Sequence, residues 1–531
     1  MDQPAAPRSL SRRTLLGAGA ALGAGVALGT GASSAAALTR VPVTREERRV
    51  VIIGSGFGGG VAALRFAQAG VPVTVLERGK RWPTGPDADT FPTLSSLDER
   101  ALWYGSASQV LGRPVSLAPY VGLLEAVVGQ NMVATCAAGV GGGSLVYQGM
   151  TLQPSEEVFA HCLPEELDYA RMDAVHYPRV ARMLQLETAP DELVASPTYK
   201  PARVFADHVR REGYALEKIP MPIDWSYALR ELDGEMKASY TNGDSALGVN
   251  NGGKHSVDVT YIKQAEDTGL VDLLIQHNVV DIERASDGRW TVHVDRTDER
   301  GTILEKKIIT TRTLVMAAGS LNTTKLLVRS VGRGHIPAID GLGTNWGTNG
   351  DRIYVWTSLA ENFGSVQGGP VVYGTKDWSD PARANTIIQA SIPGLGINVR
   401  STMMVGFGVS EARGRFTYDG WRDSAELTWP KNGDAELFDA IHRRAKRIAA
   451  PLGFLTDTNA VVPSTWHGLG GVAMGTSCDL EGRVHDMPGL YVLDGALIPG
   501  TTAACNPSMT IAAVAERAMD EIVAHDVGTL I

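Results

Sequence analysis

Cysteine is scarce in this sequence. Only 4 of the 531 residues are cysteines, and they stand alone at positions 136, 162, 478 and 505. Because no two of them form a C-x-x-C pair, zinc and iron–sulfur sites of the usual spacing are excluded and no metal site is expected. The spacing selects no disulfide: one could form outside the cell, but buried thiols are the default expectation.

The sequence also lacks an excess of positive charge, a long apolar run and a strict glycine period. A net charge of -9 argues against general nucleic-acid binding. Glycine contributes 60 residues, more than the usual share of about 7%, but without the Gly-X-Y repeat of collagen. With 44% hydrophobic and 20% charged residues, the composition predicts a soluble globular protein of two domains.

Residues 1–37 have the pattern of a bacterial export signal. Arg12 and Arg13 precede an apolar stretch at 15–28, and small residues follow at 35–37. A membrane anchor is the alternative, but the apolar stretch is shorter than the ~20 residues that span a bilayer. The paired arginines favour the twin-arginine route. We therefore expect a secreted protein that binds its cofactor before export.

A βαβ unit is predicted at the start of the mature chain. Its parts are a β-branched strand at 49–53, a helix at 61–69 and a second strand at 73–76. Between the first strand and the helix lies Gly54-x-Gly56-x-x-Gly59. In this motif the glycines allow a tight turn, close approach of backbone to a pyrophosphate and close helix–strand contact. The motif predicts a dinucleotide site at the helix N-terminus.

Glu77 strengthens this prediction, because it ends the second strand at roughly the usual distance of about 20 residues from the motif. Its carboxylate is placed to accept hydrogen bonds from ribose hydroxyls. The choice between FAD and NAD rests on three further points. An exported enzyme needs a tightly held cofactor, and both a second glycine cluster at 139–144 and a turn at Asp494-Gly495 suggest a long ligand. We therefore predict FAD.

The remaining pattern predicts an α/β protein. Further strands are expected at 271–275, 290–294, 303–309, 313–316, 353–357, 403–409 and 490–493, and helices at 202–212, 323–329 and from Asn506-Pro507 onward. Because nucleotide-binding segments occur at the start, middle and end of the chain, two interleaved domains are expected. The FAD-binding domain is assigned residues 38–80, 131–155, 255–340 and 461–531; the substrate domain is assigned 81–130, 156–254 and 341–460.

Two residues near the C-terminus are candidates for catalysis. His467 lies in a glycine-rich loop, where backbone and ligand can approach closely, and a histidine can accept a proton from an alcohol. A structural histidine in a glycine turn fits equally well. Asn506 precedes Pro507 and would begin the last helix, with its positive end toward a reduced flavin. An ordinary capped helix is the alternative.

Taken together, these motifs resemble the glucose–methanol–choline (GMC) oxidoreductase family, in particular its cholesterol oxidase branch. The matching stretches are residues 51–59, 139–146, 249–254 with 260–261, 318–321, 343–350, 467–471 and 490–507. They cover essentially the whole mature chain in the same order. The resemblance implies noncovalent FAD in a Rossmann-like domain and a second domain whose mixed or antiparallel sheet, covered by helices, roofs an apolar substrate cavity.

The resemblance also implies roles for individual residues. His467 matches the catalytic histidine, which would hold the substrate hydroxyl and help to take its proton, and Asn506 matches the active-site asparagine. The carbinol hydride would pass to the flavin, and dioxygen would reoxidise it to give peroxide. The residues assigned to FAD are Gly54, Ser55, Gly56, Phe57, Gly58, Gly59, Glu77, Gly141, Gly142, Gly143, Ser144, Met150, Val279, Gly319, Asp494, Gly495 and Asn506.

The sequence departs from the family at two places. Gln389 aligns with a glutamate that serves cholesterol oxidases as the base that moves the steroid double bond. Because an amide cannot act as that base, isomerisation is expected to be weak or to fall to another group. Tyr147-Gln148 replaces the family's Asn-Gly after the glycine loop, close to the flavin and the oxygen path. Substrate fit and oxygen reactivity are expected to change there.

These expectations define a monomeric, secreted FAD enzyme that oxidises the 3β-hydroxyl of a sterol or similar bulky apolar alcohol with O2. Transient contact with a lipid membrane would supply the substrate. One alternative is a related dehydrogenase that uses another electron acceptor. A second alternative is a flavin- or sterol-binding protein without turnover, against which the presence of both His467 and Asn506 argues.

Overall fold

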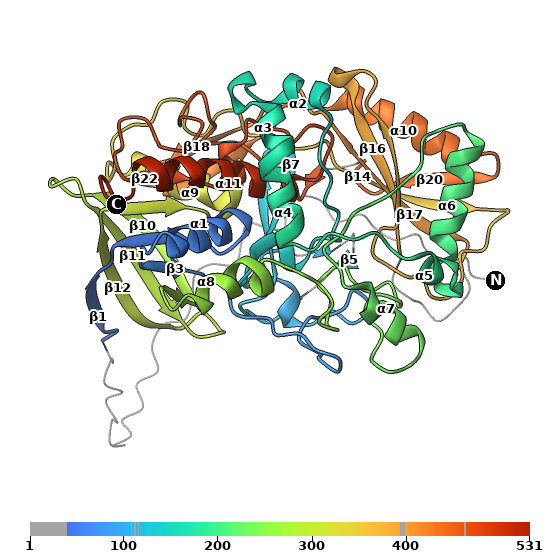
Figure 1. Ribbon diagram of the computed structural model, residues 1–531, viewed down its shortest axis with the longest axis horizontal. Coiled ribbons are helices and arrows are strands. Elements are labelled where there is room, and N and C mark those ends of the chain that lie inside the picture. The colour runs from blue at the N-terminus through green and yellow to red at the C-terminus, as the bar shows by residue number, and fades with distance from the viewer. Residues whose placement is uncertain (1–39, 108, 111–112, 115, 393–398, 461–462) are drawn as a thin grey trace, which may run out of the picture. The chain divides into compact units, whose positions relative to one another are not determined.

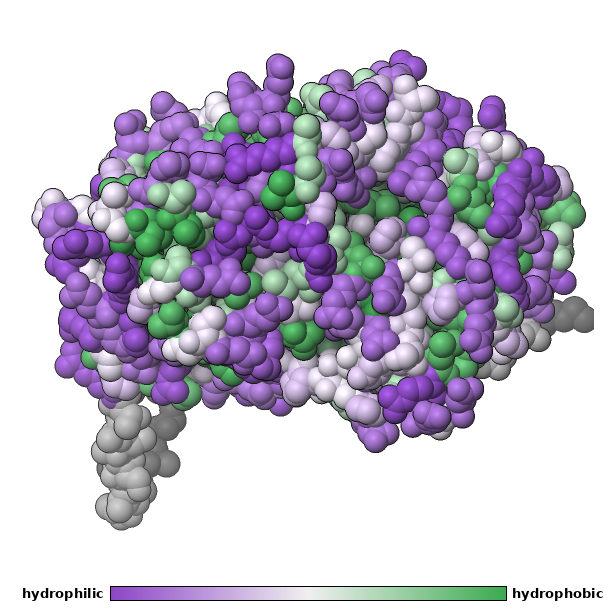
Figure 2. All heavy atoms as spheres, viewed as in Figure 1, coloured by the Kyte–Doolittle hydropathy of each residue, from purple (hydrophilic) through white to green (hydrophobic). Residues whose placement is uncertain are grey.

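The computed structural model describes residues 40–531 apart from 108, 111–112, 115, 393–398 and 461–462. The expected export signal at 1–37 lies outside the described residues. Val41 to Ile531 forms one compact unit. No helix in the described ranges combines the length and the apolar character needed to cross a bilayer. In the view of Figure 2 most of the surface is hydrophilic, with apolar residues in scattered groups.

The centre of the FAD-binding half is a five-stranded parallel sheet. Its strands in spatial order are β22 (Leu490–Val492), β13 (Thr313–Met316), β2 (Val50–Ile53), β3 (Val73–Leu76) and β9 (Val271–Leu274). β2, β3 and β13 are buried along their whole length, as expected for a parallel sheet covered on both faces. The predicted strands at all five positions are confirmed.

Several helices contribute to the core around this sheet. The three longest of them are α1 (Phe57–Gln68), α9 (Gly319–Gly332) and α11 (Pro507–His525). Figure 1 shows α1 alongside α11, although they come from opposite ends of the chain. A four-stranded sheet, also visible in Figure 1, consists of β1 (Val43–Glu47), β12 (Ile303–Thr311), β11 (Trp290–Thr297) and β10 (His277–Arg284).

A second large sheet forms the other half. Its six strands in spatial order are β20 (Gly453–Asp457), β14 (Arg352–Ser358), β17 (Ser401–Gly408), β16 (Asn385–Ala390), β15 (Tyr373–Asp377) and β8 (Glu217–Lys218), all paired antiparallel. One face carries α10 (Ala435–Ala449) and α6 (Lys200–Arg211), both beside this sheet in Figure 1. We call it the helix-covered face. The opposite face turns toward the candidate site.

Smaller elements complete the fold. The strands are β4 (Gln109–Val110), β5 (Arg113–Pro114), β6 (Leu124–Gly129), β7 (Met132–Ala137), β18 (Arg415–Asp419), β19 (Ser424–Thr428) and β21 (Ser464–Thr465). The helices are α2 (Glu156–Cys162), α3 (Tyr169–Arg171), α4 (Tyr177–Met183), α5 (Asp191–Ala195), α7 (Trp225–Leu232) and α8 (Lys263–Asp267).

The α/β class is confirmed, but two helices begin four residues earlier than predicted, α1 at Phe57 rather than at 61 and α9 at Gly319. α9 begins at Gly319 rather than at 323, because Gly319 adopts a φ of 82° and its amide is bonded by Asp494. The parallel and four-stranded sheets use segments assigned to the FAD-binding domain, and the six-stranded sheet uses segments assigned to the substrate domain. The division into two domains stays a prediction, since Val41–Ile531 forms a single compact unit.

Candidate active site

Three glycines leave open space where the fingerprint predicts a dinucleotide. A Cβ at Gly143 or Gly319 would meet no atom within 4 Å, and a Cβ at Gly56 would meet only the Cα of Gly142, at 3.9 Å. Gly56 lies directly before α1 and Gly319 begins α9, so both lie at the positive end of a helix. This open, amide-lined space fits the pyrophosphate of FAD.

Three neighbouring glycines serve contact between backbones instead. A Cβ at Gly54 would lie 2.3 Å from the carbonyl oxygen of Ala317, and one at Gly58 would lie 1.7 Å from that of Leu493. A Cβ at Gly59 would lie 2.1 Å from the carbonyl oxygen of Gly54. These positions hold α1 against the ends of β2, β13 and β22. Ser55 and Phe57 lie between the glycines.

Glu77 sits at the carboxyl end of β3 and is 5% exposed. One carboxylate oxygen accepts hydrogen bonds from the backbone amides of Gly79 and Gly139, at 2.8 and 3.2 Å. The other accepts from the Ser55 hydroxyl at 2.6 Å. Glu77 therefore joins the fingerprint loop to the second glycine cluster, and its carboxylate lies where the sequence places the ribose.

The second glycine cluster forms a tight turn at residues 139–144. Gly141 and Gly142 have φ values of 105° and 54°, which other residues rarely adopt. The Ser144 hydroxyl donates to the carbonyl oxygen of Gly141 at 2.7 Å and accepts from the amide of Val257 at 2.9 Å. Ser144 thus fixes the turn from within.

Tyr147 and Gln148, the residues that depart from the family pattern, follow this turn. The Tyr147 ring lies edge-on to Phe57, with centroids 5.7 Å apart, and the Lys254 Nζ lies 4.7 Å from its centroid. Lys254 donates to the carbonyl oxygens of Tyr147 and Leu145 at 2.6 and 3.0 Å. Burial lowers the pKa of Lys254 to about 7. Lys254 therefore fixes the backbone that directly follows the glycine turn at 139–144.

Asp494 connects the C-terminal turn to the start of α9. One carboxylate oxygen accepts from the Gly319 amide at 2.7 Å and from the Thr323 hydroxyl at 2.5 Å. The other accepts from the amide of Ala496 at 2.7 Å, across Gly495. Burial raises the pKa of Asp494 to about 6. Asp494 thus positions Gly319, one of the three glycines that face open space.

We expect Asp494→Asn to weaken FAD retention roughly tenfold or more, because an amide offers one acceptor oxygen to three donors that need two. Losing a hydrogen bond to a charged group costs about 1.5–3 kcal/mol. The ratio of flavin to protein absorbance after purification measures the effect. Asp479→Asn, in a turn that does not contact α9, is the matched control. Unchanged FAD content in Asp494→Asn would show that the hydrogen bonds of Asp494 are not needed for FAD binding.

His467 is held by a carboxylate. Its Nδ1 lies 2.7 Å from Oδ1 of Asp351, whose side chain is fully buried. Oδ2 of Asp351 accepts from the Thr465 hydroxyl at 2.6 Å and from the Trp466 amide at 3.3 Å. Because Nδ1 donates to the carboxylate, Nε2 is left as a proton acceptor. This geometry is that of an oriented general base, with Asp351 fixing the tautomer.

Asn506 does not cap α11. It occupies the N-cap position, but its side chain makes no capping hydrogen bond. Nδ2 instead donates to the carbonyl oxygen of Met150, and Oδ1 accepts from the amide of Leu152 at 3.3 Å. The ordinary-cap interpretation is therefore wrong. The amide joins the start of α11 to the segment that carries Met150, the methionine assigned to the flavin.

Gln389 does not face the site. Side chains alternate along β16, and Ile387, on the same side as Gln389, contacts the core of the helix-covered face. Gln389 is fully buried, and its Nε2 donates to the Thr402 hydroxyl at 3.2 Å. The assignment of Gln389 as a site residue is therefore corrected.

The site-facing residues of β16 are Thr386, Ile388 and Ala390. Ile388 pairs with Val405 on β17, and Phe407, on the same side of β17 as Val405, lies with its ring 5.9 Å from that of His467. Ile388 and Phe407 belong to one apolar cluster. The wall opposite His467 therefore carries apolar groups and one hydroxyl along β16, and no carboxylate.

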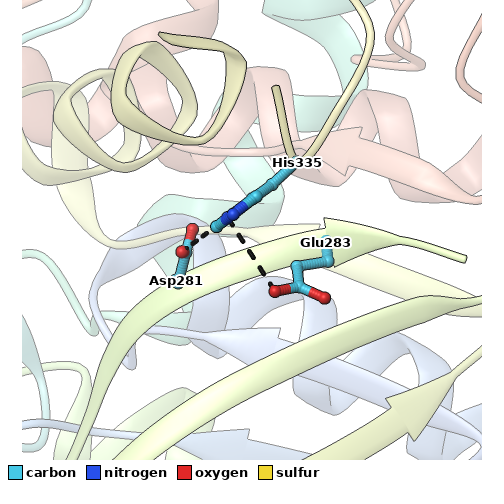
Figure 3. Close-up of side chains that lie close together, drawn as sticks. All are labelled: Asp281, Glu283 and His335. Carbon is cyan, nitrogen blue, oxygen red and sulfur yellow. Dashed lines mark hydrogen bonds and ion pairs between the residues drawn. The ribbon is translucent and has the colours of Figure 1, made fainter. Parts of the chain in front are cut away.

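Val279 lies in β10, beside a bulge in its pairing with β11. Further along β10, Asp281 and Glu283 lie close to His335 (Figure 3). His335 Nδ1 is 2.7 Å from Asp281, which also accepts from Arg333 at 2.6 Å and from Ser330 at 2.8 Å. Arg333 also donates to Asp423, so the cluster forms an ion-pair network that joins β10 to the end of α9.

Asp351 is a residue of the candidate site that the sequence did not single out. It follows directly on the stretch 343–350, which was recognised only as a matching motif. A carboxylate placed between that glycine-containing stretch and the strand at 353–357 was the available signal. Its pairing with His467 depends on two segments that are distant in the chain, so only the structure brings them together.

Comparisons with known proteins show the family of the chain. GMC oxidoreductase models match residues 115–347 and 420–515, together more than half of the chain, and an FAD binding domain model matches 49–83. A cholesterol oxidase of Mycobacterium tuberculosis is 27% identical, over 88% of this chain and 90% of the relative. A cholesterol oxidase of Acinetobacter baumannii is 24% identical, over 89% and 94%.

The fold is also shared by a solved structure. Pyridoxine 4-oxidase from Mesorbium loti superposes with a TM-score of 0.61 at 14% identity, over 90% of this chain and 99% of the other. The chain belongs to the GMC oxidoreductase family. Within that family it falls in the cholesterol oxidase branch, and it is an FAD-dependent oxidoreductase acting on alcohols.

Proposed function

We propose that this protein oxidises the 3β-hydroxyl of cholesterol or a similar sterol to the ketone, with O2 as electron acceptor and H2O2 as the second product. The observation that carries the proposal is the 2.7 Å hydrogen bond between His467 and buried Asp351. It leaves Nε2 ready to accept the hydroxyl proton. The apolar wall around Ile388 and Phe407 suits a bulky apolar alcohol.

The protein's own residues would act as follows. Asp351 keeps His467 in one tautomer, and Nε2 takes the proton from the substrate hydroxyl. Asn506 and the positive end of α11 favour negative charge nearby. Gly56, Gly143, Gly319 and Glu77 would hold FAD, which when bound accepts the hydride from the carbinol carbon and passes its electrons to dioxygen.

We expect the early product to be the 5-en-3-one, because no carboxylate stands on the site-facing side of β16. The measurement is the ultraviolet band of a conjugated enone, which should develop more slowly than peroxide. Gln389→Glu should not accelerate it, since that side chain points to the helix-covered face, where an unpaired buried carboxylate would only destabilise the fold. Rapid formation of the conjugated product by the wild type would contradict this expectation and would show that another group in the site acts as the base.

Peroxide release on aerobic addition of cholesterol tests the proposed function against its two alternatives. Prompt peroxide supports the oxidase. Flavin bleaching that persists in air would indicate a dehydrogenase that uses another acceptor. No bleaching would indicate a binding protein, and both of the latter results would reject the proposal.

We further propose export by the twin-arginine route and transient contact with a lipid membrane that supplies the sterol. Arg12-Arg13 and the short apolar stretch after them support export. Leu359, Leu452 and Phe454, exposed by 59%, 50% and 60% at the edge of the six-stranded sheet, support the membrane contact. For export, we expect the variant R12K/R13K to leave the precursor in the cytoplasm. For membrane contact, we expect the protein to float with cholesterol-containing vesicles.

A further inference from the structure

The turn at residues 501–505, which leads into Asn506, has strained backbone geometry. Ala503 and Ala504 both have a φ of 59°, in the left-handed region that alanine rarely adopts. Both residues are fully buried. Such a conformation persists only where the surrounding structure enforces it.

Asn349 supplies most of the hydrogen bonds that hold this turn. Its Nδ2 donates to the carbonyl oxygen of Cys505 at 2.7 Å and to the Thr502 hydroxyl at 3.0 Å. Its Oδ1 accepts from the Thr502 amide and from the Thr501 hydroxyl, both at 3.1 Å. Asn349 is fully buried, so both ends of one amide are committed to the residues that precede Asn506.

The segment 347–351 reaches both halves of the candidate site. Gly347 exchanges two backbone hydrogen bonds with Leu469, at 2.8 and 3.0 Å, in the loop that carries His467. Two residues beyond Asn349, Asp351 holds His467 directly. The carbonyl oxygen of Asn349 accepts from the amide of Gly408 at 2.8 Å, which anchors the segment to β17. The backbone of Asn349 is therefore held in place by β17, while its side chain holds the turn at 501–505.

We propose that Asn349 is a positioning residue, which sets the place of Asn506 and of the N-terminal end of α11 relative to the flavin. The inference rests on the proposed function, because it assigns Asn506 a part in flavin-dependent alcohol oxidation. Asn349 touches neither the cofactor nor the substrate in this account. It acts through the strained turn at 501–505.

The first test is Asn349→Ala in the FAD-loaded enzyme. We expect anaerobic flavin reduction at saturating cholesterol to slow roughly 10- to 100-fold, the effect of a displacement of about 1 Å in a reacting pair, with a smaller change in KM. The flavin midpoint potential should fall, because the positive end of α11 stabilises the anionic reduced flavin less well. Since the potential is measured without any alcohol, it remains informative if the sterol proposal fails.

Asn385→Ala is the matched control. Asn385 is also a buried asparagine, but it lies on the helix-covered face of β16, bonded to Arg383 and Arg444. We expect this variant to lose thermal stability and to keep the wild-type midpoint potential. A general loss of stability is thereby separated from a displaced Asn506.

Two combinations show whether Asn349 acts through the turn. Ala504→Gly added to Asn349→Ala should restore part of the rate and potential, because glycine adopts a positive φ freely. Asn349→Ala added to Asn506→Ala should slow flavin reduction no further than Asn506→Ala alone, since residues in one pathway are not additive.

Three results would overturn the proposal: a wild-type potential and rate in Asn349→Ala, multiplying effects in the Asn506 double variant, or no recovery with Ala504→Gly. If Asn349→Ala does not fold, Asn349→Asp takes its place. Aspartate keeps the size of asparagine and the oxygen that accepts from Thr501 and Thr502. Its second oxygen would repel the carbonyl oxygen of Cys505, to which the asparagine NH2 group donates. A wild-type potential and rate in Asn349→Asp would equally overturn the inference.

Discussion

Replacing Asp351 with asparagine should slow flavin reduction by the alcohol at least about 100-fold, the lower end of what a general base contributes. The reason is the orientation that the neighbours impose on the new amide. Oδ2 of Asp351 accepts from Thr465 and Trp466, so the asparagine oxygen would occupy that position. Its NH2 group would then point at Nδ1 of His467 and force the proton to Nε2, which could no longer accept one.

Asp526→Asn is the control for this prediction. Asp526 is likewise buried, but its carboxylate accepts from Arg483 at 2.8 Å and from the Tyr491 hydroxyl at 2.9 Å, and it bonds neither to His467 nor to the segment 347–351. We expect this variant to stay within a few-fold of the wild-type rate. Single-turnover absorbance of the flavin measures both variants. Comparable rates in Asp351→Asn and the wild type would show that His467 is not the base.

A methyl group at Gly56 should weaken FAD binding while leaving the fold intact. Because a Cβ there meets only the Cα of Gly142, at 3.9 Å, the apoprotein can accommodate alanine. The methyl group would instead occupy space at the start of α1 that the pyrophosphate needs. Overpacking costs about 1–3 kcal/mol, so the dissociation constant should rise roughly 5- to 150-fold.

Two other glycines calibrate this result. Gly58→Ala would place a Cβ 1.7 Å from the carbonyl oxygen of Leu493, so we expect loss of folded protein rather than of FAD alone. At Gly85 a Cβ meets nothing within 4 Å, and Gly85→Ala should behave like the wild type. Titration of apoprotein with FAD, followed by flavin fluorescence, measures the affinities. Unchanged affinity in Gly56→Ala would place the pyrophosphate elsewhere.

The parallel-sheet half could be predicted well because its signals are local. The runs at 50–53 and 314–316 are continuously apolar and are followed by glycine turns, and both lie in buried strands. The starts of α1 and α9 were each predicted four residues late. Both helices begin within glycine-containing turns, and the first turn of α9 depends on Asp494, far along the chain, so no local pattern reports that contact.

The site was predicted in part. Glu77 follows β3 as the sequence predicts, and His467 lies in the predicted glycine-containing loop, after β21. The side of the sheet on which Gln389 lies could not be predicted, because side chains alternate along a strand and the register of the sheet decides which face each one takes. Asp351 and Asn349 were missed because each contacts a segment that is distant in the sequence. An aspartate or asparagine at such a position does not by itself reveal its partner.

The most direct test of the central claim is anaerobic addition of cholesterol to the FAD-loaded protein, followed by flavin absorbance. The account predicts that cholesterol bleaches the flavin stoichiometrically and that the same amount of its 3α-epimer does not. When air is admitted, the flavin colour should return and peroxide should form. An unbleached flavin in the wild type, or equal bleaching of the wild type and His467→Ala, would contradict it.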